Sequence, residues 1–103
     1  MNFLKKLLGI SPAFDIAALL QQGAIIIDVR SPAEFKGGHI DGSTNIPLEL
    51  IAANATILNE KKVPIITVCR SGARSGMATK ILKNAGITVF NGGSWDSLQS
   101  KIQ

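Results

Sequence analysis

The sequence predicts an α/β fold in which helices cover both faces of an open, mainly parallel sheet. Two apolar runs rich in β-branched residues, Ala24–Val29 and Val63–Cys69, are too short for helices and do not alternate with polar residues. Such runs are typical of strands buried on both faces, and strands of this kind form parallel sheets. Helical patterns precede, separate and follow the two runs, which predicts helices on both faces of the sheet.

A helix is predicted before the first strand. Ser11 is suited to the N-cap and Pro12 to the first helical position, while Gly23 follows the last apolar residue of the pattern. The apolar stripe of this helix consists of Phe14, Ala17, Ala18 and Leu19. Residues 1–10 are expected to form an N-terminal arm or short helix that packs against the domain or frays.

Short elements connect the two predicted strands. Pro32–Lys36 is expected to form a helical turn, and Gly37–Gly42 a glycine-rich loop. Thr44–Ile46 is expected to be briefly extended, and a longer helix to begin near Leu48. No repeat, linker or low-complexity segment interrupts this order.

The chain after Cys69 predicts a helix, a strand and a last helix. The apolar face of the predicted helix directly after Cys69 consists of Met77, Ala78, Ile81 and Leu82. This helix is expected to end at Asn84, Ala85 and Gly86. Ile87–Phe90 is the predicted strand, and Asn91–Gly93 is expected to turn the chain. Ser94 is suited to cap the last helix, whose apolar residues are Trp95, Leu98 and Ile102.

Composition restricts the classes of protein that the chain can belong to. A length of 103 residues with 46% hydrophobic and 17% charged residues predicts a single folded domain over residues 1–103. A net charge of +4 favours a small anion or an acidic partner, and basic clusters interleaved with aromatic residues, typical of nucleic-acid binding, are absent. No apolar run approaches the ~20 residues of a membrane span, and no signal-peptide pattern is present, so we expect no stable membrane insertion.

Cys69 is the only cysteine and His39 the only histidine. One chain therefore builds neither a disulfide nor a tetrahedral Cys/His zinc site. We expect a reduced, cytoplasmic, monomeric protein with one free thiol and with no metal or cofactor.

The free thiol lies where open α/β sheets bind ligands, because Cys69 ends the second predicted strand. Residues 70–75, Arg-Ser-Gly-Ala-Arg-Ser, are able to curl so that backbone N–H groups and the next helix N-terminus surround the sulfur. This environment predicts a fall in the thiol pKa from about 8.5 to roughly 3.5–7.5. The alternative is a small buried hydrophobe at a strand end, but such a residue needs no polar loop with two arginines.

A longer pattern surrounds this loop and covers most of the chain, from about residue 11 to residue 98. Its segments are Cys69–Ser75, Asp28–Phe35, Gly38–Ser43 with Asn45–Pro47, and Asn91–Gly93 with Trp95. The first of these resembles the active-site loop of the single-domain rhodanese (thiosulfate sulfurtransferase) family. The next two resemble the first signature of that family, and the last resembles its C-terminal segment.

The resemblance implies a two-step sulfur transfer. The Cys69 thiolate attacks the sulfane sulfur of a small anionic donor such as thiosulfate, releases sulfite and becomes a persulfide. Cyanide, a thiol or a protein thiol then accepts the sulfur. The loop N–H groups stabilise the sulfur anion, and Arg70 and Arg74 attract the donor. The residues expected to bind the donor are Arg70, Ser71, Gly72, Ala73, Arg74 and Ser75.

Four other residues are expected to support the site. In the family, the signature that contains Asp28 and Arg30 belongs mainly to the scaffold beneath the active-site loop. Glu34 either pairs with Arg30 or stays solvated. His39 has a structural counterpart in the family and is not assigned the role of a base, and Trp95 belongs either to the core or to the lining of the site.

Two alternative functions remain at this point. Cysteine phosphatases and arsenate reductases also have an anion-binding loop after a strand, but their arginine follows the cysteine by six residues. Here Arg74 is the fifth residue after Cys69 and Ser75 the sixth, and the smaller ring suits a single sulfur atom better than a tetrahedral oxyanion. The other alternative, a persulfide carrier that docks on a partner protein, has the same chemistry at Cys69.

Overall fold

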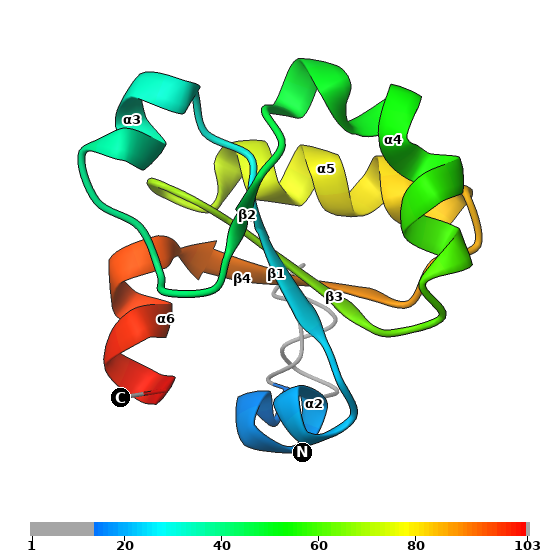
Figure 1. The fold of residues 1–103 in the computed structure, drawn as a ribbon, viewed down its shortest axis with the longest axis horizontal. Coiled ribbons are helices and arrows are strands. Elements are labelled where there is room, and N and C mark those ends of the chain that lie inside the picture. The colour runs from blue at the N-terminus through cyan, green and yellow to red at the C-terminus, as the bar shows by residue number, and fades with distance from the viewer. Residues whose placement is uncertain (1–13, 103) are drawn as a thin grey trace, which may run out of the picture.

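The computed structural model describes residues 14–102, which form a four-stranded sheet with helices on both of its faces (Figure 1). The strand order is β2-β1-β3-β4, and all neighbouring strands are parallel, which confirms the predicted fold class. The elements are α2 (Ile16–Gln21), β1 (Ile25–Asp28), α3 (Pro32–Lys36), β2 (Thr44–Asn45), α4 (Leu48–Glu60), β3 (Ile65–Cys69), α5 (Ala73–Asn84), β4 (Val89–Ser94) and α6 (Trp95–Ile102). Within this described part of the chain, no helix is long and apolar enough to cross a membrane.

The two central strands bury side chains on both faces, because successive residues of a strand point to opposite sides. On one face, Ile27 and Ile65 pack in a core with residues of α4 and α5. On the other face, Ile26 and Ile66 pack with residues of α2 and α6 (Figure 1). This two-sided burial explains why the runs that form β1 and β3 do not alternate between apolar and polar residues.

Several elements have the positions that the sequence predicts. β1 and β3 lie within the two apolar runs, and α3 spans Pro32–Lys36 as predicted. A capping box explains the sharp start of α3: Oγ of Ser31 accepts the N–H of Glu34 at 3.2 Å, and the carboxylate of Glu34 accepts the N–H of Ser31 at 3.0 Å.

The first described helix begins later than the pattern predicts. α2 starts at Ile16, and Asp15 is its N-cap, with Oδ1 accepting the N–H of Ala18 at 3.1 Å. Aspartate is among the best N-cap residues, and it competes well with the serine that the sequence analysis favoured. The predicted cap at Ser11 with Pro12, and the predicted arm at residues 1–10, lie outside the described residues.

The apolar face predicted for α5 is partly wrong. Met77 is 58% exposed, whereas Ala78 and Leu82 are buried as predicted. Ser75 and Thr79 complete the buried face, since residues 75, 78, 79 and 82 lie on one side of a helix. Met77 lies two residues from each of the two hydroxyl residues and therefore on the opposite side.

The predicted turn at Asn91–Gly93 is also wrong, because these residues belong to β4. Between the paired residues Thr67–Asn91 and Cys69–Ser94, β4 has one more residue than β3, so the strand contains a bulge. Gly92 is required there: a Cβ at Gly92 would lie 2.9 Å from both the Cγ2 of Ile66 and the carbonyl oxygen of Thr67. The glycines therefore mark a bulge with close backbone packing.

Candidate active site

The Cys69 sulfur lies at the carboxyl end of β3, directly before the N-terminus of α5. Its Sγ accepts hydrogen bonds from the N–H of Gly72 at 3.0 Å and from the N–H of Ser75 at 3.4 Å. Gly72 is the N-cap of α5 and provides no capping side chain. The sulfur therefore satisfies N–H groups at the helix start that a capping side chain usually satisfies, in a position that favours a negative charge.

Gly72 gives the loop its tight turn. Its φ of 101° is in the left-handed region, where residues with a side chain are strained. This conformation directs the Gly72 N–H at Sγ while the chain enters α5. The glycine of the predicted loop is thus required by the backbone geometry.

The environment of Cys69 contains opposing influences on its pKa. Burial has the largest individual effect and raises the pKa, because it disfavours the charged thiolate. The contact with the Ser75 side chain, whose Oγ lies 3.3 Å from Sγ, and hydrogen bonds from the N–H groups of Ser75, Gly72 and Ser71 act in the opposite direction. Together they outweigh burial and leave the pKa of the Cys69 thiol below its ordinary value.

We expect the rate of Cys69 alkylation by iodoacetamide to rise with pH, with a midpoint below the ~8.5 of a free thiol. Intact mass spectrometry measures the rate, and the signal has one source because the chain has one cysteine. The same protein unfolded in urea is the control and should show the free-thiol midpoint. A native midpoint at or above that of the unfolded protein would show that the loop does not stabilise the thiolate.

Arg74 forms an ion pair with Glu34 on α3. Two of its guanidinium nitrogens lie 2.7 and 3.0 Å from the two carboxylate oxygens of Glu34. The predicted pairing of Glu34 with Arg30 is therefore wrong, because Arg30 turns back to Asp28 at 2.7 Å. The ion pair offsets the charge of Arg74, whereas Arg70 is exposed and forms no ion pair among the described residues.

The hydrogen bond from Arg74, together with the Ser31 N–H, lowers the pKa of Glu34 from 4.5 to about 2. The ionised carboxylate therefore contributes stability that is present above pH 4.5 and is lost as the pH falls through about 2. We expect Glu34→Gln to be less stable than the wild type at pH 6, and the difference to shrink towards pH 2. Urea unfolding at several pH values measures this, and a difference independent of pH would contradict it.

Asp28 and Arg30 form a buried ion pair beside the loop, with side chains 0% and 5% exposed. Arg30 also donates to the carbonyl of Gly38 at 2.7 Å, and its guanidinium lies 4.8 Å from the ring centre of Trp95. The pair thus connects the end of β1 with the glycine-rich loop and with the start of α6. These contacts support the scaffold role predicted for both residues.

His39 is held by its own neighbours. Its ring stacks on Phe35 with 3.6 Å between ring centres, and its Nδ1 lies 2.7 Å from the Phe35 carbonyl oxygen. These contacts favour the structural role over that of a catalytic base.

A groove of about 390 Å³ lies between α3, Arg70 after β3, and the start of α6. Its charged lining residues are Arg30, Glu34, Arg70 and Asp96. Trp95 also lines the groove, so it borders the site region as well as packing on the core. Cys69 is not part of the lining, because the residue is fully buried. The groove borders the site without reaching the sulfur.

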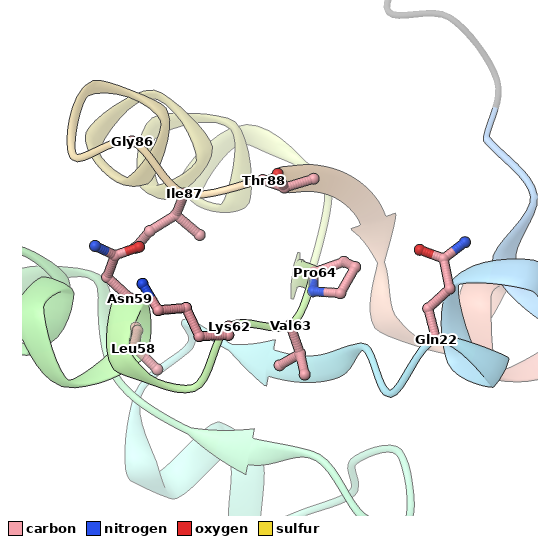
Figure 2. Close-up of a pocket in the computed structure, with 9 residues that line it drawn as sticks. All are labelled: Gln22, Leu58, Asn59, Lys62, Val63, Pro64, Gly86, Ile87 and Thr88. Atoms are coloured by element: carbon pink, nitrogen blue, oxygen red, sulfur yellow. The ribbon is translucent and has the colours of Figure 1, made fainter.

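A second hollow of about 410 Å³ lies at the opposite end of the sheet (Figure 2). Its lining includes Pro64 and Thr88, which precede β3 and β4, and Lys62 is the only charged residue among the nine that line it. Parallel sheets bind ligands at the carboxyl ends of their strands, and this hollow lies at the amino ends. The position of Cys69, rather than the size of a hollow, identifies the candidate site.

Two polar residues with no role predicted from the sequence contact Gly72 and Ser75 next to the Cys69 sulfur. Asn91 donates from Nδ2 to the Gly72 carbonyl at 3.1 Å, and its Oδ1 accepts from the Ser75 hydroxyl at 2.7 Å. Thr67 donates from Oγ1 to the Ser75 carbonyl at 3.0 Å. Thr67 is a polar residue inside an apolar run, and this pattern could have marked it as a functional candidate. The glycines that follow Asn91 instead favoured a turn at that position, so its role was not predicted.

Comparisons with known proteins identify the family of the chain. A model of the rhodanese-like domain matches residues 13–100. The thiosulfate sulfurtransferase PspE of Escherichia coli is 33% identical over 104 residues, with 98% of each chain covered. The structure of a rhodanese with anions from E. coli is 35% identical, with a TM-score of 0.65, and the match covers 71% of this chain and 88% of the other.

Other relatives are longer than this chain. A putative sulfur carrier protein of Bacillus subtilis, YrkF, is 41% identical over 61 residues, which are 59% of this chain and 32% of YrkF. The chain spans about half, 54%, of another B. subtilis protein, to which it is 42% identical over 69 residues. Because the domain model matches residues 13–100 and PspE is 33% identical over 98% of the chain, the protein belongs to the rhodanese-like domain family.

Proposed function

We propose that this protein is a sulfurtransferase that moves a sulfane sulfur from thiosulfate or a similar anionic donor, through a persulfide at Cys69, to a thiol. The observation that carries the proposal is the convergence of two backbone N–H groups on Sγ at the start of α5. The thiolate and the persulfide are both sulfur anions, and N–H groups directed at the sulfur stabilise negative charge of this kind.

In the first step, a lone pair of the Cys69 thiolate attacks the outer sulfur of thiosulfate. A new S–S bond forms at Cys69 while the S–S bond of thiosulfate breaks, and sulfite leaves with that electron pair. The persulfide keeps one negative charge, so no proton is transferred and no oxidant or general base is needed. The position of His39 away from this chemistry is consistent with that requirement.

The donor needs access to a sulfur that is fully buried. The residues that cover the sulfur therefore have to move before the donor reaches Sγ. Arg70, directly after Cys69, is exposed and lines the adjoining groove, so it is the cation best placed to attract a dianion. Arg74 is less suited than predicted, because its hydrogen bonds go to Glu34.

In the second step, a thiolate or cyanide attacks the outer sulfur of the persulfide, and Cys69 leaves as the thiolate. The groove beside the loop offers charged residues of both signs and the Trp95 ring to an acceptor larger than cyanide. The names of PspE and YrkF support two versions of the same chemistry, an enzyme acting on thiosulfate and a carrier that passes sulfur to another protein.

The phosphatase alternative has less support from the site. A phosphate group needs an arginine directed into the loop, and Arg74 is instead hydrogen-bonded to the carboxylate of Glu34 on another helix. The direction of Arg74 and the short spacing between Cys69 and Arg74 therefore both disfavour phosphatase activity.

Intact mass spectrometry tests the proposed function. We expect the protein to gain the mass of one sulfur atom on incubation with thiosulfate, and to lose it again on addition of cyanide, with formation of thiocyanate. Protein alkylated at Cys69 beforehand is the control and should gain no sulfur. Failure of thiosulfate to modify the thiol, under conditions in which iodoacetamide does, would contradict thiosulfate as the donor.

A further inference from the structure

The hydroxyl of Ser75 has one proton and two neighbours that are able to accept it. Its Oγ lies 2.7 Å from Oδ1 of Asn91 and 3.3 Å from Sγ of Cys69. Ser75 is fully buried, so these two atoms compete for the proton without bulk water as a third partner. Only one of them receives the hydrogen bond at a time.

The carboxamide of Asn91 is oriented by two backbone groups with fixed roles. The N–H of Gly93 only donates, and it lies 2.9 Å from Oδ1. The carbonyl of Gly72 only accepts, and it lies 3.1 Å from Nδ2. These two contacts place Oδ1 towards Ser75, and because a carbonyl oxygen only accepts, Ser75 is the donor in the 2.7 Å contact.

Close packing keeps Asn91 in this position. A Cβ added to Gly76 of α5 would lie 3.3 Å from Nδ2 of Asn91, so the helix passes very near the carboxamide. The bulge of β4 begins directly after Asn91. The side chain is therefore held between the catalytic loop, α5 and its own strand.

We propose that Asn91 is a positioning residue that holds the Ser75 proton away from Cys69 and thereby controls how many hydrogen bonds the sulfur receives. With the hydroxyl directed to Asn91, a lone pair of Ser75 Oγ faces the sulfur. This arrangement fits a protonated thiol, whose S–H donates to Oγ. An anionic sulfur attracts the hydroxyl proton instead, and Asn91 opposes that rotation.

The effect of Asn91 on catalysis rests on the proposed sulfur transfer. The position of the Ser75 hydroxyl proton does not depend on that proposed function. Each hydrogen bond that a thiolate receives lowers its pKa and also lowers its intrinsic nucleophilicity. By withholding one donor, Asn91 leaves a thiolate that the N–H groups of Gly72 and Ser75 stabilise but that is still reactive. Asn91 thus sets a balance between the amount of thiolate and its reactivity.

A double-mutant cycle on the thiol pKa tests this inference without thiosulfate. The four proteins are the wild type, Ser75→Ala, Asn91→Ala and the double variant, and alkylation rate against pH gives the pKa of Cys69 in each. We expect Ser75→Ala to reduce the ionisation constant about three- to tenfold more in the Asn91→Ala background than in the wild type. The reason is that without Asn91 the hydroxyl donates to the thiolate.

The cycle separates this effect from a general loosening of the site. Any loosening caused by Asn91→Ala is present with and without Ser75, so it cancels. The charged groups around the sulfur, Arg74 with Glu34 and Asp28 with Arg30, are also unchanged in all four proteins.

Two further backgrounds complete the test. Asn91→Asp keeps an acceptor for the hydroxyl, so the effect of Ser75→Ala there should be as small as in the wild type. Asn91→Leu has a similar shape without an acceptor, and it replaces Asn91→Ala if that variant does not fold. An equal or smaller effect of Ser75→Ala in the backgrounds without an acceptor would overturn the inference. Failure of the proposed function would appear separately, as the absence of sulfur addition by thiosulfate.

Discussion

Replacing Cys69 with serine is expected to reduce sulfur transfer from thiosulfate to cyanide by at least about a thousandfold, because a hydroxyl forms no persulfide. Serine keeps the size of the side chain and an atom that accepts the Gly72 N–H, so the variant should fold. Thiocyanate formation measures the rate, and circular dichroism checks the fold. Intact mass spectrometry should show no sulfur added to the variant.

Ser97→Ala is the matched control for this prediction. Ser97 is exposed on α6 and lies outside the loop that was predicted to bind the donor. We expect its turnover to stay within about threefold of the wild type, since exposed substitutions of this kind have small effects. A serine variant at Cys69 that transferred sulfur as fast as this control would show that the reaction does not pass through the thiol.

The parts of the fold that were predicted correctly depend on local patterns. β1 and β3 follow from runs of apolar residues, and α3 follows from a serine, a proline and a glutamate within four positions. The bulge at Asn91–Gly93 depends on pairing with β3, more than twenty residues earlier in the chain, and on the close approach of Gly92 to Ile66. A glycine pair has the same local appearance in a turn and in a bulge, so the sequence alone favoured the commoner structure.

The same distinction applies to the site. Cys69 and Ser75 are six positions apart, so their approach could be expected from spacing and from the position of the thiol at a strand end. The pairing of Arg74 with Glu34 joins residues 40 positions apart, and only the folded chain brings α3 near the first turn of α5. The catalytic assignment of the loop stays a prediction, to which the structure adds the geometry of the N–H groups.

Asp28→Asn is expected to lower the free energy of unfolding by about 3–5 kcal/mol, because it leaves the charge of Arg30 buried without a partner. The Asp28 carboxylate accepts hydrogen bonds from the backbone N–H, Nε and a terminal guanidinium nitrogen of Arg30, at 3.0, 2.9 and 2.7 Å. The carboxamide of asparagine has the same size as the carboxylate but carries no charge. The packing is therefore kept, and the negative charge that compensates the guanidinium of Arg30 is lost. A loss of this size is a large part of the ~5–15 kcal/mol that usually stabilises a domain.

Urea unfolding at pH 7 measures this loss, and two other variants show its cause. Asp28→Asn combined with Arg30→Met removes both charges and keeps an apolar side chain next to Trp95, so it should recover at least about half of the lost stability. Glu34→Gln breaks an ion pair whose side chains are about a third exposed, 37% and 32%, and its effect at pH 7 should be much smaller than that of Asp28→Asn. If the double variant were no more stable than Asp28→Asn, the uncompensated charge of Arg30 would not be the cause. The loss would then lie in the hydrogen bonds that hold the end of β1 against the glycine-rich loop.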